Sequence, residues 1–335
     1  MAVRIGQSTI QFTNKPSVIG YGSVVGKKEF EGPLSSEFDA HDLDSRFGEI
    51  SFEKAESRMQ KIAVETALRK SNLNEQDINI IFAGDLLNQC VGSSFGLRAM
   101  GIPFAGIYGA CSTMTLGLIL ASVCVDSAAA NCAAAVTSSH FCSAERQYRF
   151  PLEYGSVRPQ SAQWTVTGAG ASIISVSNNK PYIDKATFGR IVDLGVKDAN
   201  NMGAAMAPSA ASTLVNFFND TDTSPEDYDC IFTGDLGKVG SDLLYILTEN
   251  DGYYIREKHK DCGLLIFDRK KQDVHAGGSG CGCSASVLNS YVFHHFESGE
   301  YKNVLFMSTG ALLSPTSTMQ GESIPGISHL VNIRK

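Results

Sequence analysis

The sequence carries little positive charge and has no long run of residues that is apolar throughout. Its 335 residues include 28 lysines and arginines against 35 aspartates and glutamates, which gives a formal net charge of -7. The basic residues form no tail or stripe, so we expect no binding to nucleic acid or to an anionic bilayer through charge alone. An anionic ligand would have to be held by local groups, against the field of the whole chain.

Paired cysteine clusters and a secretory leader are also missing. The nine cysteines are an odd number at irregular spacings: Cys90, Cys111, Cys124, Cys132, Cys142, Cys230, Cys262, Cys281 and Cys283. Together with an N-terminal stretch that has no apolar core, this predicts reduced thiols in a cytosol-like compartment. The Cys-x-Cys pair at 281 and 283 has no second pair to complete a zinc site. The glycine-rich stretch around it lacks the Gly-Lys-Ser/Thr ending of a phosphate loop.

The segment from 116 to 136 is the most apolar part of the chain. It contains Asp126 and Asn131, which are costly to place in hydrocarbon. We therefore predict a buried helix from Thr113 to about Ser127, then a turn and a buried strand over Cys132–Ser138, instead of a membrane span.

The chain contains an internal repeat. The stretch "DINIIFAGDL" at 77–86 recurs as "DYDCIFTGDL" at 227–236, offset by 150 residues, with six of ten positions identical. A helix-like stretch precedes each copy, beginning at Glu56 and at Pro208. This predicts two similar halves, 1–178 and 179–335.

Each half alternates apolar strand-like segments with helix-like segments. The strand that starts at Ser17 has a rough counterpart in "ATFGRIVDLGVKD" from Ala186, and the strand from Cys132 has one in "NVLFMSTGA" from Asn303. A glycine-containing apolar run from Thr167 closes the first half. The pattern predicts an α/β fold with a largely parallel or mixed central sheet.

Ligand sites in α/β folds gather at the carboxyl ends of strands and at helix N-termini. Asp85 and its repeat mate Asp235 follow predicted strands, and Cys111 in "GIYGACSTMTLG" lies at the N-terminus of the helix predicted from Thr113. Free amides at a helix N-terminus favour negative charge, which predicts a lowered pKa for the Cys111 thiol. The alternative is that Cys111 is a small buried apolar residue, as most free cysteines are.

Several motifs resemble elements of the thiolase superfamily, in particular of its ketoacyl-synthase III branch. They are "YGACST" at 108–113, "WTVTGAGASIIS" at 164–175, "GGSGCGCSAS" and "MSTGALLSP". The resemblance covers nearly the whole chain and implies a duplicated five-layer α/β/α/β/α fold, with the cysteine at a buried helix N-terminus. It also implies a homodimer joined at a central strand, here around Gly101–Gly109.

Condensing enzymes of that superfamily also use a histidine and an asparagine from the second half. The aligned positions hold Gly234 and Cys281, and neither can replace those side chains, because glycine has none and a thiol is a weak donor. The resemblance therefore implies a non-catalytic chain. The alternative is an acyl-thioester transferase or condensing enzyme that uses Cys111, with His140 or His275 as the base.

Three stretches, "IFAGDLLNQC", "YGACSTM" and "HAGGSGCGCSAS", resemble more narrowly a branch of the superfamily from spore-forming bacteria. That resemblance implies binding of dipicolinic acid, free or as its calcium chelate, to support its uptake into the developing spore. It implies no cofactor, and a place at the periphery of the spore inner membrane through proteins of a dipicolinate channel assembly. A purely structural role in that assembly is a further alternative. The expected ligand-binding residues are Asp85, Cys111, Ser112, Thr113, His140, Gly234, Asp235 and Cys281.

Four of the expected ligand-binding residues have a specific physical role. The hydroxyls of Ser112 and Thr113 suit a carboxylate, and the missing side chain at Gly234 leaves room for the ring. Asp85 would repel a bare dianion, so we expect it either to ligate calcium carried by the ligand or to shape the pocket. The nearby cations are expected at the surface: Arg146, Arg149, Arg158, Arg190 and Lys197.

Overall fold

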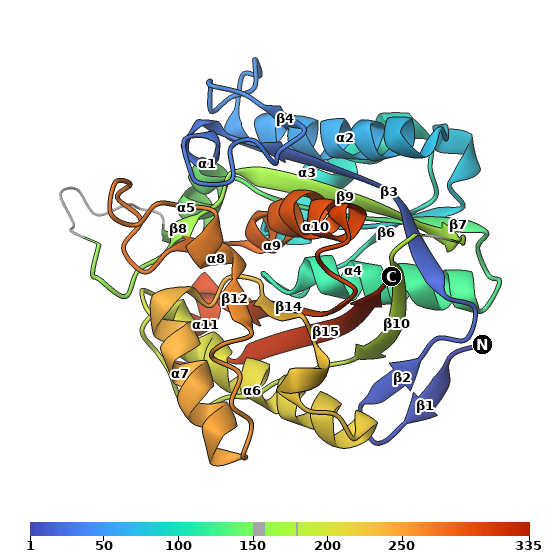
Figure 1. Cartoon of the computed structure of the whole chain (residues 1–335). Helices are drawn as coiled ribbons and strands as arrows, with labels where there is room; N and C mark the ends of the chain where they lie inside the picture. The colour runs from blue at the N-terminus through green and yellow to red at the C-terminus, as the bar shows by residue number, and fades with distance from the viewer. Residues whose placement is uncertain (150–157, 179) are drawn as a thin grey trace.

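The computed structural model describes residues 1–149, 158–178 and 180–335, and it has two halves of similar element order (Figure 1). The first half contains strands β1 (Val3–Ile5), β2 (Thr9–Gln11), β3 (Pro16–Val25), β4 (Ala40–His41), β5 (Ile80–Gly84), β6 (Phe104–Gly106), β7 (Cys132–Ser139), β8 (Trp164–Thr165) and β9 (Gly168–Val176). Its helices are α1 (Lys27–Phe30), α2 (Phe52–Ser71), α3 (Val91–Leu97), α4 (Thr113–Asp126) and α5 (Phe141–Arg149).

The second half repeats this alternation. Its strands are β10 (Tyr182–Thr187), β11 (Cys230–Thr233), β12 (His259–Asp261), β13 (Gly278–Ser279), β14 (Asn303–Ala311) and β15 (Gly326–Arg334). Its helices are α6 (Met202–Thr221), α7 (Gly237–Asn250), α8 (Cys262–Leu265), α9 (Cys281–Val287), α10 (Phe293–Ser298) and α11 (Pro315–Met319). A π-helical turn (Leu288–Val292) joins α9 to α10.

The main sheet has a mirrored strand order. It runs β12-β11-β14-β15-β10-β3-β9-β7-β5-β6, so each strand of one half has a mate at the same distance from the centre. In both halves an inner strand (β5 or β11) lies parallel to its two neighbours. At the centre, β10 and β3 pair through one residue pair, Tyr182 with Ser17, and β10 also pairs with β2 of the first half. This order agrees with a duplication; the exact boundary between 178 and 179 stays a prediction, because Asn179 lies outside the described residues.

The elements stack in five layers. Helix α2 packs on β3 and β9 at one outer face, and α6, with α7 against it, covers β14 and β15 at the opposite face. Helices α4 and α9 lie between and contact strands of both halves (Figure 1). The predicted α/β/α/β/α fold class is confirmed.

Local sequence explains how closely α2 approaches the sheet. The helix begins at the cap Ser51, whose hydroxyl accepts a bond from the Lys54 amide, and it ends at Asn72 in the left-handed conformation. A Cβ on Gly20 or Gly22 of β3 would lie 2.5 Å from a carbonyl oxygen of α2. Glycine at these two positions therefore lets the helix lie directly on the strand.

The most apolar segment forms the predicted pair of elements. Helix α4 spans Thr113–Asp126, and strand β7 spans Cys132–Ser139, so both predictions are confirmed. Buried as they are between other layers, both can be apolar on nearly every side.

Two element boundaries in the second half differ from prediction. The strand expected from Ala186 is β10, which starts four residues earlier and ends at Thr187. The residues that follow leave the core, and Ile191 and Leu194 are exposed. Helix α6 likewise starts before Pro208, because Asn201 caps it through a bond to the Ala204 amide.

Candidate functional site

A tight turn carries Cys111 into α4. Ala110 is left-handed, with φ of 49°. The Ser112 and Thr113 hydroxyls each donate a 2.6 Å hydrogen bond, to the carbonyl oxygens of Gly109 and Ala110 respectively. Both side chains are fully buried and hold the turn, so their contact with a ligand stays a prediction.

Gly310 in β14, from the second half, packs closely against this turn. A Cβ on Gly310 would lie 2.6 Å from the Gly109 carbonyl oxygen and 3.1 Å from the Ser112 amide nitrogen. Any larger residue would displace the turn, so the glycine of "MSTGALLSP" positions Cys111 from the opposite half.

The Cys111 thiol lies in a desolvated environment. Its side chain is 5% exposed and hydrogen-bonds with Asp235, near Ser279 and the Gly280 amide. Burial raises the pKa of the thiol well above its ordinary value, and the Asp235 carboxyl group raises it further. The prediction that the helix N-terminus lowers the pKa of this thiol is wrong, because desolvation outweighs the effect of the helix. The thiol is held in its protonated, weakly nucleophilic form near neutral pH.

Asp235 is the ionisable partner of this thiol. One of its oxygens accepts a 2.7 Å bond from the Thr309 hydroxyl, and the other accepts a 2.8 Å bond from the Gly280 amide. Burial raises the pKa of the carboxyl group to about 7 despite these donors. Near neutral pH the site therefore combines a protonated thiol with a carboxyl group that is only partly ionised.

The expected room at Gly234 is absent. A Cβ there would lie 3.1 Å from the Ser284 Cβ and 3.1 Å from the Ser308 Cα, so the position is already filled by its neighbours. The prediction that a ligand ring occupies this space is corrected. The side chain that reaches Cys111 from this loop belongs to Asp235, one residue later.

Cys281 lies behind Cys111. Its thiol donates a 2.9 Å bond to the Ser138 carbonyl oxygen, and its side chain is fully buried. With Cys111, Leu86 and Ala144 it forms a small apolar cluster. Both thiols are free.

Asp85 is sealed away from this cluster. One carboxylate oxygen accepts a 2.9 Å bond from the Leu87 amide, and the other accepts bonds of 2.7 and 2.6 Å from the Ser93 amide and hydroxyl. Burial raises the pKa of its carboxyl group. Asp85 thus holds the loop that leads into α3. This agrees with the alternative in which Asp85 shapes the pocket, and not with the one in which it ligates calcium.

The neighbour of Asp85 is Glu56 on α2, which was not among the predicted site residues. Glu56 is fully buried and accepts bonds from the Ser138 and Ser143 hydroxyls, and burial with the Asp85 charge raises its pKa to about 8. Gln60, one turn later, donates to the hydroxyls of Ser93 and Ser138. The available signal was a pair of polar residues, four apart, on the apolar face of a predicted helix.

The two histidines considered as bases lie elsewhere. His140 accepts the Cys142 amide at Nδ1, and its Nε2 donates a 2.6 Å bond to the Ser45 carbonyl oxygen, so both ring nitrogens are occupied. His275 contacts the Pro159 carbonyl oxygen and Asp273. Neither lines the cavity at Cys111, and the expectation that His140 reaches the ligand is corrected.

A small cavity of about 30 Å³ lies beside Cys111. Among the described residues its lining includes Leu86, Tyr108, Tyr148, Thr165, Met202, Ser279 and Leu313. The hydroxyls of Tyr108 and Tyr148 are 3.0 Å apart, and Tyr148 also donates to the Leu86 carbonyl oxygen. Of the predicted site residues, Cys111 lines this cavity. Asp235 and Cys281 do not line the cavity but contact the Cys111 side chain.

No lysine or arginine lines this cavity within the described residues. Arg146 pairs with Glu53, and Arg158 pairs with Asp273 at 2.8 Å. Arg190 and Lys197 are exposed, while the Arg149 side chain lies outside the described part of the chain. Within that part, no cluster of three or more His, Cys, Asp or Glu side chains could hold a metal ion.

The fold is similar to those of several solved structures. A 3-oxoacyl-[acyl-carrier-protein] synthase III from Aquifex aeolicus matches with a TM-score of 0.60 and 15% identity, covering 96% of this chain and all of the other. An OleA variant from Xanthomonas campestris with cerulenin matches with a TM-score of 0.62 and 11% identity, covering 97% of this chain and 98% of the other. At these identities the likeness concerns the fold alone.

Sequence comparison is more specific. The chain is 45% identical over 324 residues to stage V sporulation protein AD of Bacillus subtilis (strain 168), covering 97% of this chain and 96% of the relative. Residues 6–334 match the SpoVAD family. Across the described residues, no helix is both long enough and apolar enough to span a membrane. The turn at Cys111, the mirrored sheet and the match over nearly the full length lead to one assignment: the chain belongs to the stage V sporulation protein AD (SpoVAD) family of sporulation proteins.

Proposed function

We propose that this chain binds dipicolinic acid in the cavity beside Cys111, without covalent catalysis, and thereby supports uptake of the compound into the developing spore. Membership of a sporulation family supports the biological setting. The cavity lining supports the chemistry, since Leu86, Met202 and Leu313 offer an apolar slot for a flat ring. The Thr165 hydroxyl is a donor for a carboxylate oxygen, whereas the Ser279 hydroxyl donates to Asp235.

The charge of the site favours a neutral form of the ligand. No cation lines the cavity among the described residues, and Asp235 lies directly behind Cys111. A bare dianion would meet an acidic, poorly solvated environment and be repelled. The calcium chelate, in which the metal cancels both carboxylate charges, avoids this penalty. The calcium is then cargo carried by the ligand.

The environment of the Cys111 thiol is the observation that supports a binding function without covalent catalysis. Burial and Asp235 raise the pKa of Cys111, so little thiolate is present to attack an acyl group. The side chain facing the thiol is a carboxyl group, and both His140 and His275 bond to groups outside the cavity. Such a thiol serves as the floor of a binding site.

Ligand entry requires the cavity to widen. A volume of about 30 Å³ holds roughly one water molecule, which is far less than a pyridine ring with two carboxylates. The hydroxyl pair of Tyr108 and Tyr148 lines the cavity, and Tyr108 is 46% exposed. In this proposal the two rings separate when the ligand enters.

Calorimetry combined with thiol labelling tests the proposal. Purified protein titrated with dipicolinate, alone and with equimolar calcium, should give heat with the chelate and slower alkylation of Cys111 when the ligand is present. Ala144→Phe fills the cavity and should remove the protection, whereas the exposed Ala99→Phe should not. No heat with either form of the ligand, at high protein concentration, would sink the proposal.

Two further measurements separate the alternatives. Intact-mass spectrometry after incubation with an acyl-thioester should show no adduct on Cys111, and an adduct would favour an acyl-transfer enzyme. Spores that carry Ala144→Phe should contain less dipicolinate than spores with Ala99→Phe. Equal contents would favour a purely structural role in the channel assembly.

The chain is also proposed to form a homodimer through β6, and to reach the spore inner membrane through partner proteins of the dipicolinate channel. Strand β6 is at one end of the sheet, with its second edge unpaired among the described residues. Phe95 and Phe104 are 56% and 41% exposed. An open edge with apolar residues is a surface that a second copy can cover. Phe104→Lys should yield monomers in analytical ultracentrifugation, whereas Met319→Lys, on an exposed residue of α11, should not.

A further inference from the structure

Two walls of the cavity at Cys111 are joined to each other by hydrogen bonds. Helix α5 supplies Ala144 and Tyr148 to the lining, and the loop after β5 supplies Leu86. The Tyr148 hydroxyl donates to the Leu86 carbonyl oxygen, and Gln147 of α5 donates to the same oxygen at 2.8 Å. A displacement of either wall is therefore transmitted to the other.

Each wall is held at its base by a buried carboxyl group. Asp85 holds the loop by accepting the Leu87 amide at 2.9 Å. Glu56 on α2 holds the helix, because its Oε2 lies 2.7 Å from the hydroxyl of Ser143 in the first turn of α5. Both acids approach Gly92, where a Cβ would lie 3.2 Å from Asp85 Oδ2 and 3.4 Å from Glu56 Cγ. Glycine at this position lets the two carboxyl groups lie close together.

The contacts of the Ser143 hydroxyl indicate a proton on Glu56. This hydroxyl lies 2.7 Å from Glu56 Oε2 and 3.1 Å from the His140 carbonyl oxygen. It has one hydrogen, and a carbonyl oxygen can only accept. Both contacts are hydrogen bonds when protonated Glu56 donates to Ser143 and Ser143 donates to His140. An ionised Glu56 takes the Ser143 hydrogen, and the first turn of α5 then loses a bond.

No cation lies beside Glu56 within the described part of the chain. The elements β3, α3, β7 and β9, which pack against α2, contain no acidic or basic residue. Helix α9 brings the Cys281 thiol, and on α5 Arg146 pairs with a surface glutamate while Glu145 lines the cavity. Burial and the Asp85 charge raise the pKa of Glu56 to about 8, so its proton is lost as the pH rises through that value.

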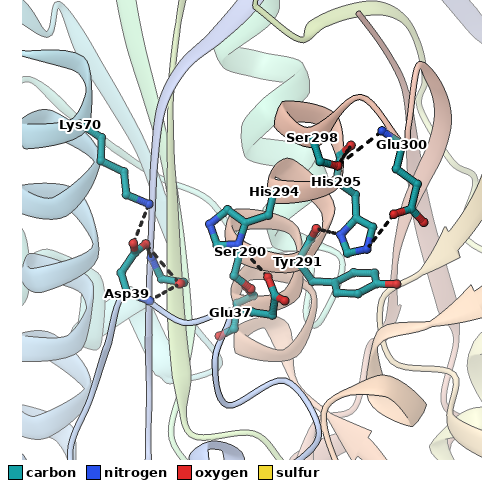
Figure 2. A network of polar contacts seen from close by, with 11 residues as sticks. Glu37, Asp39, Lys70, Ser290, Tyr291, His294, His295, Ser298 and Glu300 are labelled. Atoms are coloured by element: carbon teal, nitrogen blue, oxygen red, sulfur yellow. Dashed lines mark hydrogen bonds and ion pairs between the residues drawn. The ribbon is translucent and has the colours of Figure 1, made fainter.

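Carboxylates near the opposite end of α2 have a different environment. Lys70, in the last turn of that helix, bonds to Asp39 at 2.6 Å, and His294 bonds to Glu37 at 2.7 Å (Figure 2). Each of these carboxylates has a partner that can balance its charge, whereas Glu56 faces a second carboxyl group. The proton is therefore what neutralises Glu56 in the folded chain.

We propose that Glu56 and Ser143 form a proton-dependent latch on the cavity at Cys111. With the proton in place, α5 is held on α2 and the cavity is closed. When the proton is lost, two neighbouring buried carboxylates repel each other, the bond from Ser143 to His140 breaks, and α5 moves outward together with the Leu86 loop. The latch supplies the widening that ligand entry requires. It concerns access to the thiol and does not rest on the function proposed above.

The pH dependence of Cys111 alkylation by iodoacetamide, measured on the whole chain, tests the latch. Glu56→Gln keeps a neutral side chain at every pH, so the ratio of the wild-type rate to its rate reports on Glu56, because Asp235 titrates in both proteins. The ratio should be near one at pH 6 and grow severalfold by pH 9, with a limit of about tenfold per pH unit for one coupled proton. The exposed Glu65→Gln on the same helix is the control and should follow the wild type.

A second variant removes the latch without changing a charge. Ser143→Ala lacks the contact at any pH, so Cys111 should be alkylated severalfold faster than in the wild type already at pH 6. Cys262, which is fully buried in α8 and does not line the cavity, is the internal reference for global unfolding. At a given pH its rate should be the same in every variant.

Hydrogen exchange gives the same comparison without thiol chemistry. The Ala144 amide, which donates to the His140 carbonyl oxygen at 3.0 Å, should lose protection between pH 7 and 9 in the wild type and keep it in Glu56→Gln. Three results overturn the proposal: a rate ratio that stays constant from pH 6 to 9, a Ser143→Ala rate equal to that of the wild type at pH 6, or Cys262 alkylation that accelerates in step with that of Cys111.

Discussion

The two copies of the Gly-Asp-Leu repeat have the same sequence and different roles. In the first half, Asp85 bonds to its own loop, at Leu87 and Ser93. In the second half, Asp235 bonds to Thr309 and to the Gly280 amide and faces Cys111. Of the two aspartates, Asp235 faces the thiol, whereas the first copy contributes Leu86 to the apolar cluster around it.

The neighbouring parallel strand explains the difference. Strand β12 ends at Asp261, which lies in register with Thr233 and accepts bonds from the Leu236 and Gly237 amides. Asp235 is thereby released from holding its own loop. The matching strand β6 ends in Gly106, which has no side chain to offer, so Asp85 must hold the loop itself. A motif thus acquires its role from the residue that the adjacent strand places beside it.

The largest expected effect concerns the pH dependence of stability, through Glu56 beside Asp85. Burial raises the pKa of Glu56 from 4.5 to about 8, so the folded state holds this proton more tightly than the unfolded state does. Its contribution to stability therefore falls as the pH rises between these values, by about 1.4 kcal/mol per pH unit. Glu56→Gln, which mimics the protonated acid, should remove that slope from urea unfolding curves at pH 5 to 7.

The exposed Glu65→Gln on the same helix is the control and should keep the wild-type slope, since Glu65 forms a surface ion pair with Lys61. Equal slopes for wild type and Glu56→Gln would show that Glu56 is ionised in the folded chain.

The next effect distinguishes the two aspartates directly. Asp85→Ala and Asp235→Ala should each lower the free energy of unfolding by roughly 2–4 kcal/mol, because buried donors lose a charged or polar acceptor. Hydrogen exchange should locate the damage differently. In Asp85→Ala the Leu87 and Ser93 amides should exchange faster, whereas in Asp235→Ala the Gly237 amide should stay protected by Asp261. Loss of Gly237 protection in Asp235→Ala would contradict the comparison.

A smaller effect is expected on the reactivity of Cys111. Asp235→Asn removes the charge that raises the thiol pKa, so alkylation of Cys111 by iodoacetamide should accelerate severalfold as the fraction of thiolate rises. Asp85→Asn should leave the rate unchanged. Peptide mass spectrometry separates Cys111 from the partly exposed Cys124, which serves as the internal reference. Equal acceleration in both variants would mean general loosening instead of a local charge effect.

The smallest effect compares one hydroxyl donor from each half. Ser93 donates to Asp85 at 2.6 Å, whereas Ser279 donates to Asp235 at 3.3 Å. Ser93→Ala should therefore lower the free energy of unfolding by about 1–2 kcal/mol, and Ser279→Ala by less than about 0.5 kcal/mol, since long hydrogen bonds are weak. Thermal unfolding of the two variants beside wild type gives the difference. A larger loss for Ser279→Ala would reverse the order of the two carboxyl environments.

Local pattern was enough to predict much of the fold. The repeat at 77–86 and 227–236 corresponds to β5 and β11, and the apolar segment corresponds to α4 and β7. The site was harder to predict. Tyr148 and Met202 line the cavity from elements far apart in the sequence, and the space at Gly234 is filled by Ser284 and Ser308. Both features depend on which side chains the folded chain brings close to Cys111 and to Gly234, and sequence spacing does not reveal this.

The sequence by itself determined the alternation of elements, the duplication pattern and a cysteine at the start of a buried helix, because these follow from periodicity and local turn chemistry. The tertiary structure decided the state of that cysteine. Desolvation and Asp235 raise the pKa of the thiol, whereas the helix N-terminus alone would lower it. Electrostatic balance depends on burial and on neighbours across the fold, and residues 124 positions apart meet only when the two halves pack together.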